Sequence, residues 1–525
     1  MRKKWFALTI AMTLVAMAAA GCGDNETKQK EQVAATTADP YDKLPKELTI
    51  QVYESGQVPS EEGTFIENRW TKWINENSPV KVKWVSIPLT GNGARTQKLN
   101  SLLAAGDAPD IIWEWGRNYP AELITQGAIQ PLDEYIEKYS TSYKAFLESN
   151  PALKSYVTFD DGSMYAATSN RTRLSSLDTG LYIRKDWLDQ LQLSMPETVE
   201  ELLEVAKAFV ERDPDGNGKK DTVAFSFDSR NFGMFENLFQ ANSGYWYSED
   251  GKAKYGPTLD RYKNFLDTFK TMYEQGMIDK EFPTDKTFER SLQLWSSGKA
   301  GMWYGAWNSV KYNEVKQNVP AAHIVPVPAV STEFGKNGYA RTPEGIGDKM
   351  FMFNKTMKNP KAAVEFLDWM LDSGWETLKY GIEGVHYKIE NGQKVPIDAE
   401  KNSKELKYAG NYILTNNYQP TVESLATPKN PDPLTQERNE LLVQAYDIFT
   451  AEPFRSDFPI PSINPELAKI KADFGNELDK IRLKAVVSGD KYTSDMAMED
   501  IRKAWSKAGG DKAEQIMQDE FVTKK

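Results

Sequence analysis

Residues 213–221, with the sequence DPDGNGKKD, place oxygen-bearing groups at the spacing of a calcium-binding loop. A hard cation such as Ca²⁺ binds several oxygen ligands at about 2.4 Å, and an EF-hand loop supplies them from alternate positions around a glycine at its sixth position. The side chains of four residues and one backbone carbonyl would take these positions: Asp213, Asp215, Asn217, Asp221 and the carbonyl of Lys219. The spacing therefore predicts a bound Ca²⁺ ion with a structural role.

The end of this loop departs from the EF-hand pattern. Its twelfth position is Ala224 instead of the bidentate glutamate, so the final oxygen has to come from Thr222, from water or from another part of the fold. The alternative is a surface loop held by Asx turns, with no metal.

A second group of candidate residues follows a short apolar strand predicted over residues 109–113. Trp113, Glu114, Trp115 and Asn118 lie at its carboxyl end, where parallel α/β sheets bind their ligands. Aromatic rings stack on the flat C–H faces of sugars, and planar polar groups hydrogen-bond the rim of hydroxyls. These residues suit a carbohydrate site, although the same rings could be packed in a core, as most aromatic residues are.

Further candidates are aromatic or polar residues near predicted strand ends, helix ends or chain crossings. Trp303 and Trp307 lie four residues apart. The others are Glu54, Ser55, Asn170, Arg171, Arg173, Tyr245, Trp246, Arg341 and Glu344. An arginine among them would suit the carboxylate of a uronic acid by bidentate pairing, but each residue also has an ordinary interpretation as a hinge, surface or helix-end residue.

Two residue counts exclude other kinds of chemistry. The chain has two histidines, His323 and His386, and one cysteine, Cys22. A metal site built on histidines, a zinc knuckle, an internal disulfide and a Cys-x-x-Cys redox pair are therefore excluded. We expect His323 to pack beside a strand and His386 to be a turn residue, and we assign neither a catalytic role.

The N-terminus has the pattern of an export signal. Basic residues precede an apolar run over residues 5–20, which is short for a membrane-spanning helix and typical of a signal peptide. The run ends in AAGC, which resembles a bacterial lipobox, with Ala19 where leucine is usual and Cys22 as the acylated residue. We predict a lipoprotein signal peptide over residues 1–21, a lipid such as palmitate on the cysteine, and a flexible polar tether over residues 22–47.

The body of the chain reads as an α/β protein. Three strands are predicted at residues 47–53, 80–85 and 109–113, and a helix between the first two would include Phe65 and Trp70. Strands that alternate with helices in this way form a parallel sheet with crossover connections.

Later helices are marked by capping residues. One is predicted to begin at Thr198 in a capping box with Glu201, and another to run from Asn359 to a stop at Gly374. The last ninety or so residues read as mostly helical, with an apolar stripe from Leu467 to Ile481.

Length and charge narrow the class of protein. A chain of 525 residues is long enough for two or more domains, since single cores rarely exceed about 300 residues. The net charge of −11 makes nucleic acid a poor partner.

Several segments together resemble the extracellular solute-binding proteins of family 1, which are receptors of ABC importers. Residues 105–113 (AGDAPDIIW) resemble the strand that enters the ligand cleft of this family, and residues 297–307 (SGKAGMWYGAW) resemble its G-K-A-x-M segment. Residues 381–387 (GIEGVHY), the calcium loop and the lipobox resemble the lipoprotein subgroup that takes up oligosaccharides. By this resemblance, Trp307 matches a sugar-stacking position.

The resemblance implies an α/β fold of the two-lobed periplasmic-binding-protein type (class II), in which each lobe has a mixed or parallel sheet with flanking helices and a hinge joins the lobes. The N-terminal lobe would hold residues 48–170 and 350–430, and the C-terminal lobe residues 175–345 and 433–525. The chain would cross between the lobes near residues 169–179, 341–349 and 427–433.

The implied function is capture of an oligosaccharide between the lobes and its delivery to the permease of an ABC importer, with no turnover. The protein would be a monomer on the outer face of the cell membrane, or facing a periplasm, and would contact the membrane through its lipid alone. Two alternatives stay open. An exported carbohydrate-active enzyme needs only two carboxylates roughly 5–10 Å apart, and a receptor of the same fold could carry a peptide or another solute.

Overall fold

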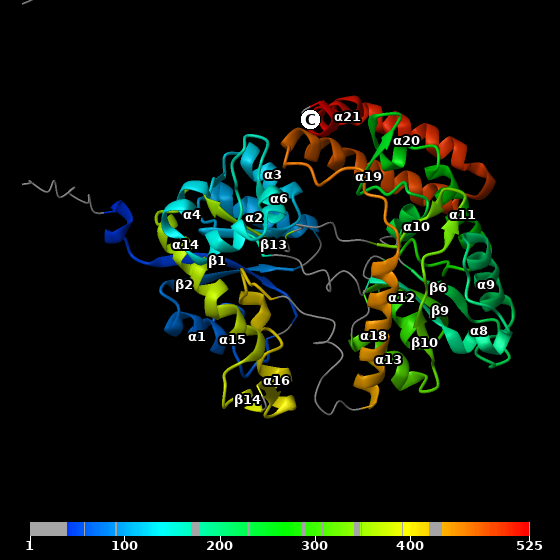
Figure 1. The fold of residues 1–525 in the computed structure, drawn as a ribbon, viewed down its shortest axis with the longest axis horizontal. Helices are drawn as coiled ribbons and strands as arrows, with labels where there is room; N and C mark the ends of the chain where they lie inside the picture. Colours follow the sequence, from blue (N-terminus) through cyan, green and yellow to red (C-terminus); the bar gives the residue numbers. More distant parts are fainter. Residues whose placement is uncertain are drawn as a thin grey trace, which may run out of the picture. The chain divides into compact units, whose positions relative to one another are not determined.

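The computed structural model describes residues 39–56, 58–89, 92–169, 179–227, 232–285, 289–306, 309–340, 347, 349–390, 392–418 and 433–523. The chain divides into two compact units, residues 1–43 and 44–525. The described part of the first unit is a 3-10 helix, η1 (Pro40–Lys43). The second unit contains two main sheets, each with its own hydrophobic core (Figure 1).

The first main sheet has five strands in the order β2-β1-β3-β13-β4. The strands are β1 (Glu47–Glu54), β2 (Lys81–Pro88), β3 (Ile111–Trp115), β4 (Ile129–Gln130) and β13 (Lys349–Asn354). The three early strands are parallel, as the sequence predicts, and β13 pairs antiparallel with β3 and β4. The carboxyl ends of β1 and β3 therefore lie at the same edge of the sheet.

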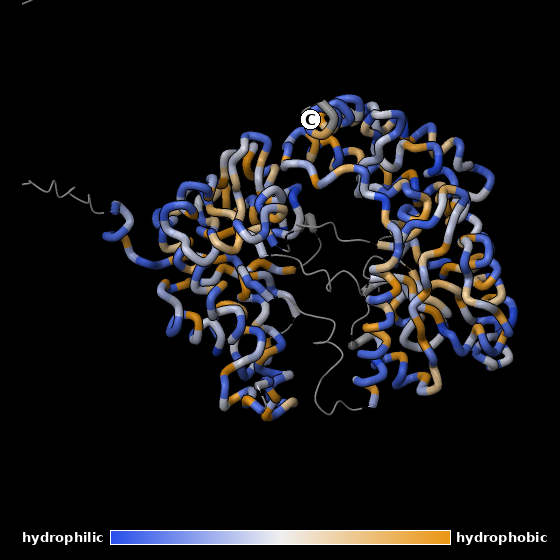
Figure 2. The backbone as a smooth tube through the Cα atoms, in the orientation of Figure 1, coloured by the Kyte–Doolittle hydropathy of each residue, from blue (hydrophilic) through white to orange (hydrophobic). Residues whose placement is uncertain are grey.

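Helices from two distant parts of the chain accompany this sheet. The early ones are α1 (Arg69–Asn77), α2 (Asn92–Ala105), α3 (Asn118–Thr125), α4 (Asp133–Tyr139), α5 (Ser142–Glu148) and α6 (Pro151–Val157). The later elements are α14 (Pro360–Trp369), η4 (Met370–Gly374), α15 (Trp375–Tyr380), β14 (Tyr387–Glu390), β15 (Gln393–Pro396), α16 (Ala399–Glu405) and η5 (Ala409–Tyr412). Hydrophobic residues recur along the strands and the facing helices (Figure 2).

The second main sheet has four strands in the order β10-β5-β9-β6. They are β5 (Thr179–Arg184), β6 (Val223–Ser226), β9 (Ala300–Ala306) and β10 (Ile324–Pro326). β6 and β9 are parallel, whereas β5 pairs antiparallel with β9 and β10. Small hairpins are formed by β7 (Trp246–Glu249) with β8 (Lys252–Tyr255) and by β11 (Ser331–Thr332) with β12 (Gly335–Lys336).

Helices of the second core include a long C-terminal set. The earlier elements are α8 (Lys185–Leu191), α9 (Val199–Glu211), α10 (Phe232–Leu238), η3 (Gly256–Thr258), α11 (Tyr262–Glu274), α12 (Glu289–Ser296) and α13 (Ser309–Asn318). The C-terminal set is α18 (Pro433–Ala451), α19 (Pro465–Val487), η6 (Gly489–Lys491), α20 (Ser494–Ala508), α21 (Gly510–Gln518) and η7 (Asp519–Thr523). The predicted apolar stripe of α19 is buried from Leu467 to Ile481.

Three helix predictions need correction. α1 begins after the capping residue Asn68, so that Phe65 lies before it. The Thr198 hydroxyl caps α9 by accepting from the Glu201 amide, but the Glu201 carboxylate accepts from the amide of Glu197 instead of closing a box on Thr198.

The predicted stop at Gly374 is wrong. Helix α14 continues through one π-helical turn, η4, into α15 and ends at Gly381, whose φ is 84°. Gly374 lies inside this helical run, where a Cβ atom would approach the Trp369 ring to 2.9 Å. The absence of a side chain at Gly374 thus serves close packing, and the left-handed residue that ends the helix comes seven positions later.

One segment ties the two cores together just before α19. Ile463 forms a parallel bridge with Phe159 and belongs to the first core, whereas Leu467 and Ile470 belong to the second. The Ile463 amide donates to the carbonyl of Thr158 at 3.1 Å. The first turn of α19 therefore begins beside the first core and leads into the second.

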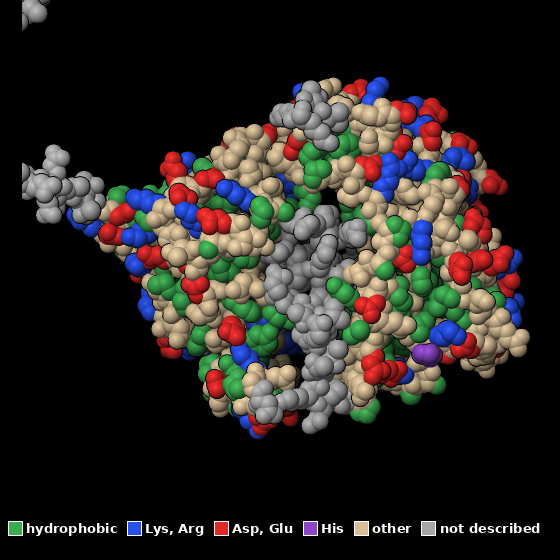
Figure 3. Space-filling view, viewed as in Figure 1, with side chains coloured by type: hydrophobic (Ala, Val, Ile, Leu, Met, Phe, Trp, Pro, Cys, Tyr) green, Lys and Arg blue, Asp and Glu red, His purple; other side chains and the backbone are tan. Residues whose placement is uncertain are grey.

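None of the helices in the described ranges is long and apolar enough to cross a bilayer. On the face shown in Figure 3, acidic and basic side chains are interspersed over the described surface.

Candidate ligand-binding site

Strand β3 carries two tryptophans two residues apart, which alternation along a strand places on the same face of the sheet. Trp113 is buried, at 3% exposure, and its indole nitrogen donates to the Gln51 carbonyl at 3.0 Å. Trp115 is 38% exposed. Of the two rings, only that of Trp115 presents a free surface large enough to stack on a sugar.

The exposed ring is held from behind by aromatic and cationic groups. Trp115 stacks on Tyr53, with ring centres 5.2 Å apart and planes 13° apart. The guanidinium of Arg95 lies 5.4 Å from the centres of both rings, within cation–π range. Trp113 meets Tyr53 and Trp115 edge-on, with ring centres 4.6 Å away in each case. This packing fixes the orientation of Trp115 before any ligand binds.

Glu114 organises the same cluster from inside. It is buried, accepts from the Tyr53 hydroxyl at 3.0 Å and the Trp115 amide at 2.7 Å, and lies 2.8 Å from Arg95 Nε. Burial raises the pKa of Glu114, although the Trp115 amide and Arg95 oppose the shift. Burial, reinforced by the charge of Glu114, raises the pKa of the Tyr53 hydroxyl. These contacts assign Glu114 to positioning Tyr53, Trp115 and Arg95.

The remaining sequence candidates near β1 and β3 lie in more open positions. Asn118 is exposed at the start of α3. Glu54, the last residue of β1, is half-buried and accepts from the Ser86 hydroxyl at 2.9 Å. Ser55 follows it, and its carbonyl accepts from Asn411 at 3.0 Å. All three lie at or beyond the carboxyl ends of parallel strands.

Two aromatic candidates of the second core are buried. Trp246 is 5% exposed and packs against Tyr255 and Trp505, with ring centres 5.1 and 6.0 Å away. Trp303 is 6% exposed and lies 6.0 Å from Trp295. Core packing, the alternative interpretation of these rings, accounts for both environments.

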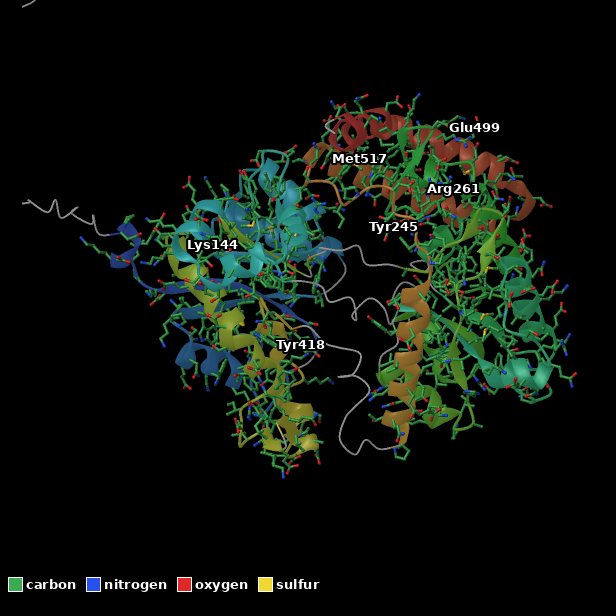
Figure 4. The ribbon with its side chains drawn as sticks, viewed as in Figure 1. Lys144, Tyr245, Arg261, Tyr418, Glu499 and Met517 are labelled. Carbon is green, nitrogen blue, oxygen red and sulfur yellow. The ribbon has the colours of Figure 1, made fainter. Side chains whose placement is uncertain are left out.

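Tyr245, beside Trp246 in sequence, has a different environment. It is half-buried in the turn before β7 and meets Phe454 edge-on at 5.5 Å (Figure 4). Seven other candidates lie outside the described residues: Cys22, Asn170, Arg171, Arg173, Trp307, Arg341 and Glu344.

Sequence reasoning missed two residues of the Trp115 cluster, Tyr53 and Arg95. Tyr53 directly precedes the candidate Glu54 at the end of β1, so the position of that strand end was a usable signal. Arg95 is in the first turns of α2 and carries no local motif. Only the fold places it between the two rings.

The predicted calcium loop is held by internal hydrogen bonds and by the ammonium group of Lys299. The Asp213 carboxylate accepts from the amides of Asn217 and Gly218, at 3.2 and 2.8 Å. The ammonium of Lys299 lies 2.7 Å from Asp215 and 3.0 Å from Asp221. Lys299 comes from the turn before β9, so this ion pair joins the loop to the second main sheet.

The other predicted loop ligands differ in their hydrogen bonds. One carboxylate oxygen of Asp215 is buried and has no hydrogen-bond partner. The Asn217 side-chain nitrogen donates to Asp215 and Asp221, and the Thr222 hydroxyl donates to the Phe209 carbonyl at 2.7 Å. Within the described ranges, no group of three or more His, Cys, Asp or Glu residues is arranged to hold a metal ion.

The two histidines have structural surroundings. His386 is buried, accepts from the Ile382 amide through Nδ1 at 2.9 Å, and has its Nε2 atom 3.0 Å from Glu405. Burial lowers the pKa of His386, against the influence of Glu405. His323 is exposed beside β10, and its carbonyl accepts from Lys185.

Comparison with known proteins places the chain in a family. Residues 59–377, more than half of the chain, match the bacterial extracellular solute-binding proteins. The polygalacturonan/rhamnogalacturonan-binding protein YtcQ of Bacillus subtilis is 30% identical over 59% of this chain and 61% of its own length. Lipoprotein LipO of the same organism is 26% identical over 97% of this chain and 96% of its own. The chain thus spans about three-fifths of YtcQ and nearly all of LipO.

Solved structures agree on the fold. Streptococcus pneumoniae FusA, an ABC-transporter substrate-binding protein in complex with kestose, superposes with a TM-score of 0.68. It is 20% identical over 91% of this chain and 100% of the FusA chain. A further FusA structure carries an EF-hand mutation. The predicted α/β fold of the two-lobed periplasmic-binding-protein type is confirmed, and this chain belongs to the bacterial extracellular solute-binding proteins.

Proposed function

We propose that this protein is the receptor of an ABC importer and that it captures an oligosaccharide without chemically changing it. The observation that carries the proposal is the exposed Trp115 ring, which Tyr53, Arg95 and Glu114 hold in place. An aromatic surface fixed before binding offers a sugar a stacking platform and avoids the entropy of ordering it later. FusA, a relative of the same fold, binds kestose.

The two cores support a two-lobed capture mechanism. Each main sheet has its own core, and β13 returns the chain to the first sheet after the second has been built. We place the N-terminal lobe at residues 48–170 and 350–430, the C-terminal lobe at residues 175–345 and 433–525, and the ligand between them. Closure of the lobes would bury the bound sugar and mark the receptor as loaded for the permease.

The proposal extends to the carbohydrate contacts outside the Trp115 cluster. Glu54 and Asn118 would supply hydrogen bonds from the strand ends, and Arg171, Trp307 and Arg341 would contact ligand from the crossings and the segment after β9. Trp113 would act beneath the surface by supporting the Trp115 ring, whereas Trp303 and Trp246 would stabilise the second core.

Calcium is proposed as a structural ion of the 213–221 loop. The donor set is that of a hard cation: carboxylate oxygens of Asp213, Asp215 and Asp221, the amide oxygen of Asn217 and the carbonyl of Lys219. The unpartnered Asp215 oxygen and the Lys299 ammonium support this, because both indicate a site that attracts positive charge. Bound calcium would offset the charge of the carboxylates. The Thr222 hydroxyl donates to a backbone carbonyl and keeps its oxygen lone pairs, so the proposed final ligand is Thr222, water or a group from another part of the fold.

The proposed location follows from the N-terminus. A lipid on Cys22 would anchor the receptor to the outer face of the cell membrane, or to a membrane facing the periplasm, and the polar tether over residues 22–47 would let it reach a permease. Mass spectrometry of the membrane fraction would detect a mature chain that begins with acylated Cys22. A Cys22→Ser variant would be released from membranes.

The test of the proposed function is a ligand panel on the soluble part of the chain. Saturation with a ligand at a hundred times its dissociation constant stabilises the fold by about 2.7 kcal/mol, which a thermal shift detects. We expect one class of oligosaccharide to raise the melting temperature with no new reducing ends after long incubation. Release of products would identify an enzyme instead, and a shift with peptides alone would identify a different cargo.

A further inference from the structure

Arg117, two residues beyond Trp115, carries a pair of buried donors that no described residue accepts. Its Nε and Nη2 atoms are both buried and lack a hydrogen-bond partner. These two nitrogens form one edge of the guanidinium plane, the fork that pairs with both oxygens of a carboxylate or phosphate group. The neighbour that Arg117 does contact is an aromatic ring, since its Cζ atom lies 5.2 Å from the centre of the Tyr156 ring.

An unsatisfied guanidinium edge is unusual in a folded protein. Buried polar groups almost always bond to protein, ordered water or ions, because an unpaired charged donor loses its hydration without replacement. Burial lowers the pKa of Arg117 to about 10, and Tyr156 and Glu520 only partly oppose the shift. The surroundings of Arg117 therefore favour a further negative charge.

A second cation, Lys471, lies on a helix that packs against the segment following Arg117. Helix α3, which Arg117 precedes, packs against α19, the helix that carries Lys471. The Lys471 ammonium lies 5.3 Å from the centre of the Tyr255 ring. Burial lowers the pKa of Lys471 to about 8, and the charge of Arg117 adds to this shift. Two like charges thus lie within electrostatic range of each other.

The acidic group that acts on Arg117 electrostatically, Glu520, is hydrogen-bonded elsewhere. Glu520, in the C-terminal turn η7, has one carboxylate oxygen that accepts from the Ser462 amide at 2.7 Å and from its hydroxyl at 3.0 Å. Glu520 acts on Arg117 through its charge, without a hydrogen bond to the guanidinium. Among the described residues, none accepts a hydrogen bond from the buried Nε and Nη2 atoms of Arg117.

We propose that Arg117 and Lys471 form a binding site for an oxyanion of the carboxylate or phosphate type. Two oxygens would occupy the Nε and Nη2 fork, and the charge of the anion would offset the repulsion between the two cations. Because α3 belongs to the first core and α19 is packed mainly in the second, a bound anion would link elements of both.

Two sources could supply this anion. One is the carboxylate of an acidic oligosaccharide whose neighbouring sugar stacks on Trp115, which would make uronate-containing chains the preferred cargo. This source rests on the proposed function. The other is a free inorganic anion such as phosphate, which would bind independently of any sugar.

The test measures both sources on the wild type and on two variants, Arg117→Met and Lys471→Met. The matched control is Lys484→Met, which removes a lysine of the same helix that lies 3.7 Å from the centre of the Tyr492 ring. Melting temperatures are compared in sodium phosphate and in sodium chloride of equal ionic strength. Calorimetric titrations compare trigalacturonate with its methyl ester, which has the same size and no charge.

Two outcomes would support the site, and each identifies the source of the anion. In the first outcome, the wild type and Lys484→Met bind trigalacturonate at least about tenfold more tightly than they bind the ester, and both site variants lose this preference. The anion is then the carboxylate of the ligand. If phosphate raises the melting temperature of the wild type and Lys484→Met but of neither site variant, the anion is a free one. A phosphate effect without binding of any sugar in the wider panel would retain the site and reject the proposed receptor function.

Other outcomes overturn the site. Sugar binding with no acid preference, together with no effect of phosphate, would reject it and leave the receptor function intact. Equal anion effects in the wild type and both site variants would reject it as well. If Glu520→Gln melts lower than the wild type and no added anion stabilises the wild type, Glu520 is the partner of Arg117 in solution and the proposal is wrong.

Discussion

Two tryptophans of the molecule, Trp115 and Trp246, have opposite environments in the fold. Trp115 ends a parallel strand of the first sheet, is 38% exposed, and rests on Tyr53 and Arg95. Trp246 begins a hairpin of the second core and is 5% exposed against Tyr255 and Trp505. Position at a strand end of the main sheet, and not residue type, distinguishes a ring available to a ligand from a ring that stabilises the fold.

The largest expected effect on stability is that of Trp246→Ala. Removing a buried tryptophan leaves a cavity, and such substitutions cost about 3–5 kcal/mol. Urea unfolding should show this loss, whereas the folded fraction should bind oligosaccharide with unchanged affinity. A stable variant with weakened binding would instead assign Trp246 to the ligand site.

Glu114→Gln should have the next largest effect. It leaves Arg95, 14% exposed, without its charged partner, and breaking such a pair costs about 3 kcal/mol. Because Glu114 also fixes the Trp115 amide and the Tyr53 hydroxyl, oligosaccharide affinity should fall together with stability. Glu365→Gln is the matched control, since Glu365 is 22% exposed, pairs with Lys46 at 2.6 Å and belongs to α14, outside the Trp115 cluster. Equal behaviour of the two variants would contradict the positioning role of Glu114.

A smaller effect is expected in the calcium loop, where charged groups take the place of the packed aromatic rings around Trp115 and Trp246. Lys299→Met removes the ammonium from Asp215 and Asp221, so that the affinity for Ca²⁺ should rise several-fold in a calorimetric titration. Without calcium the variant should lose up to about 1 kcal/mol, the usual size of a partly exposed ion pair. Lys219→Met, which leaves the backbone carbonyl in place, should behave like the wild type. No calcium binding by any of the three proteins would contradict the metal site.

The smallest expected effect is a pH dependence from His386. Its folded-state pKa is lowered below the ordinary value of about 6.5, mainly by burial, with Lys401 and Arg69 adding to the shift and Glu405 opposing it. The unfolded chain therefore binds the proton more readily, and stability is lost as pH falls from about 6.5 through the folded-state pKa. Denaturant midpoints of the wild type and His386→Gln across this window should differ in slope. Parallel curves would show that His386 does not titrate differently on folding.

The sequence predicted the parallel core of the first sheet, because β1, β2 and β3 carry strong local patterns. It did not predict the pairing of β13 with β3, since nothing in a strand specifies a partner more than two hundred residues away. The helix end misplaced at Gly374 has a similar cause, because the packing against Trp369 that favours glycine there is not visible in local sequence.

The candidate site was predictable only in part, because local patterns mark strand ends but not the residues that pack against them. Trp115 and Glu114 were found from their place after the strand predicted over residues 109–113, but their supporting residues Tyr53 and Arg95 come from separate elements. Strand alternation places Trp113 and Trp115 on the same face, so their different exposure depends on what packs over each ring. Long-range packing, which decides exposure, is the information that the residues alone did not carry.

The most direct test of the central claim is calorimetric titration of the wild type and Trp115→Ala with the oligosaccharide that gives the largest thermal shift. We predict that the wild type binds it without turnover. Trp115→Ala should bind at least about tenfold more weakly while its melting temperature stays close to that of the wild type, because an exposed ring contributes stacking to the ligand and little to the core. Equal affinity of the two proteins would contradict the claim that Trp115 is the sugar platform, and the absence of binding to any oligosaccharide would contradict the receptor function.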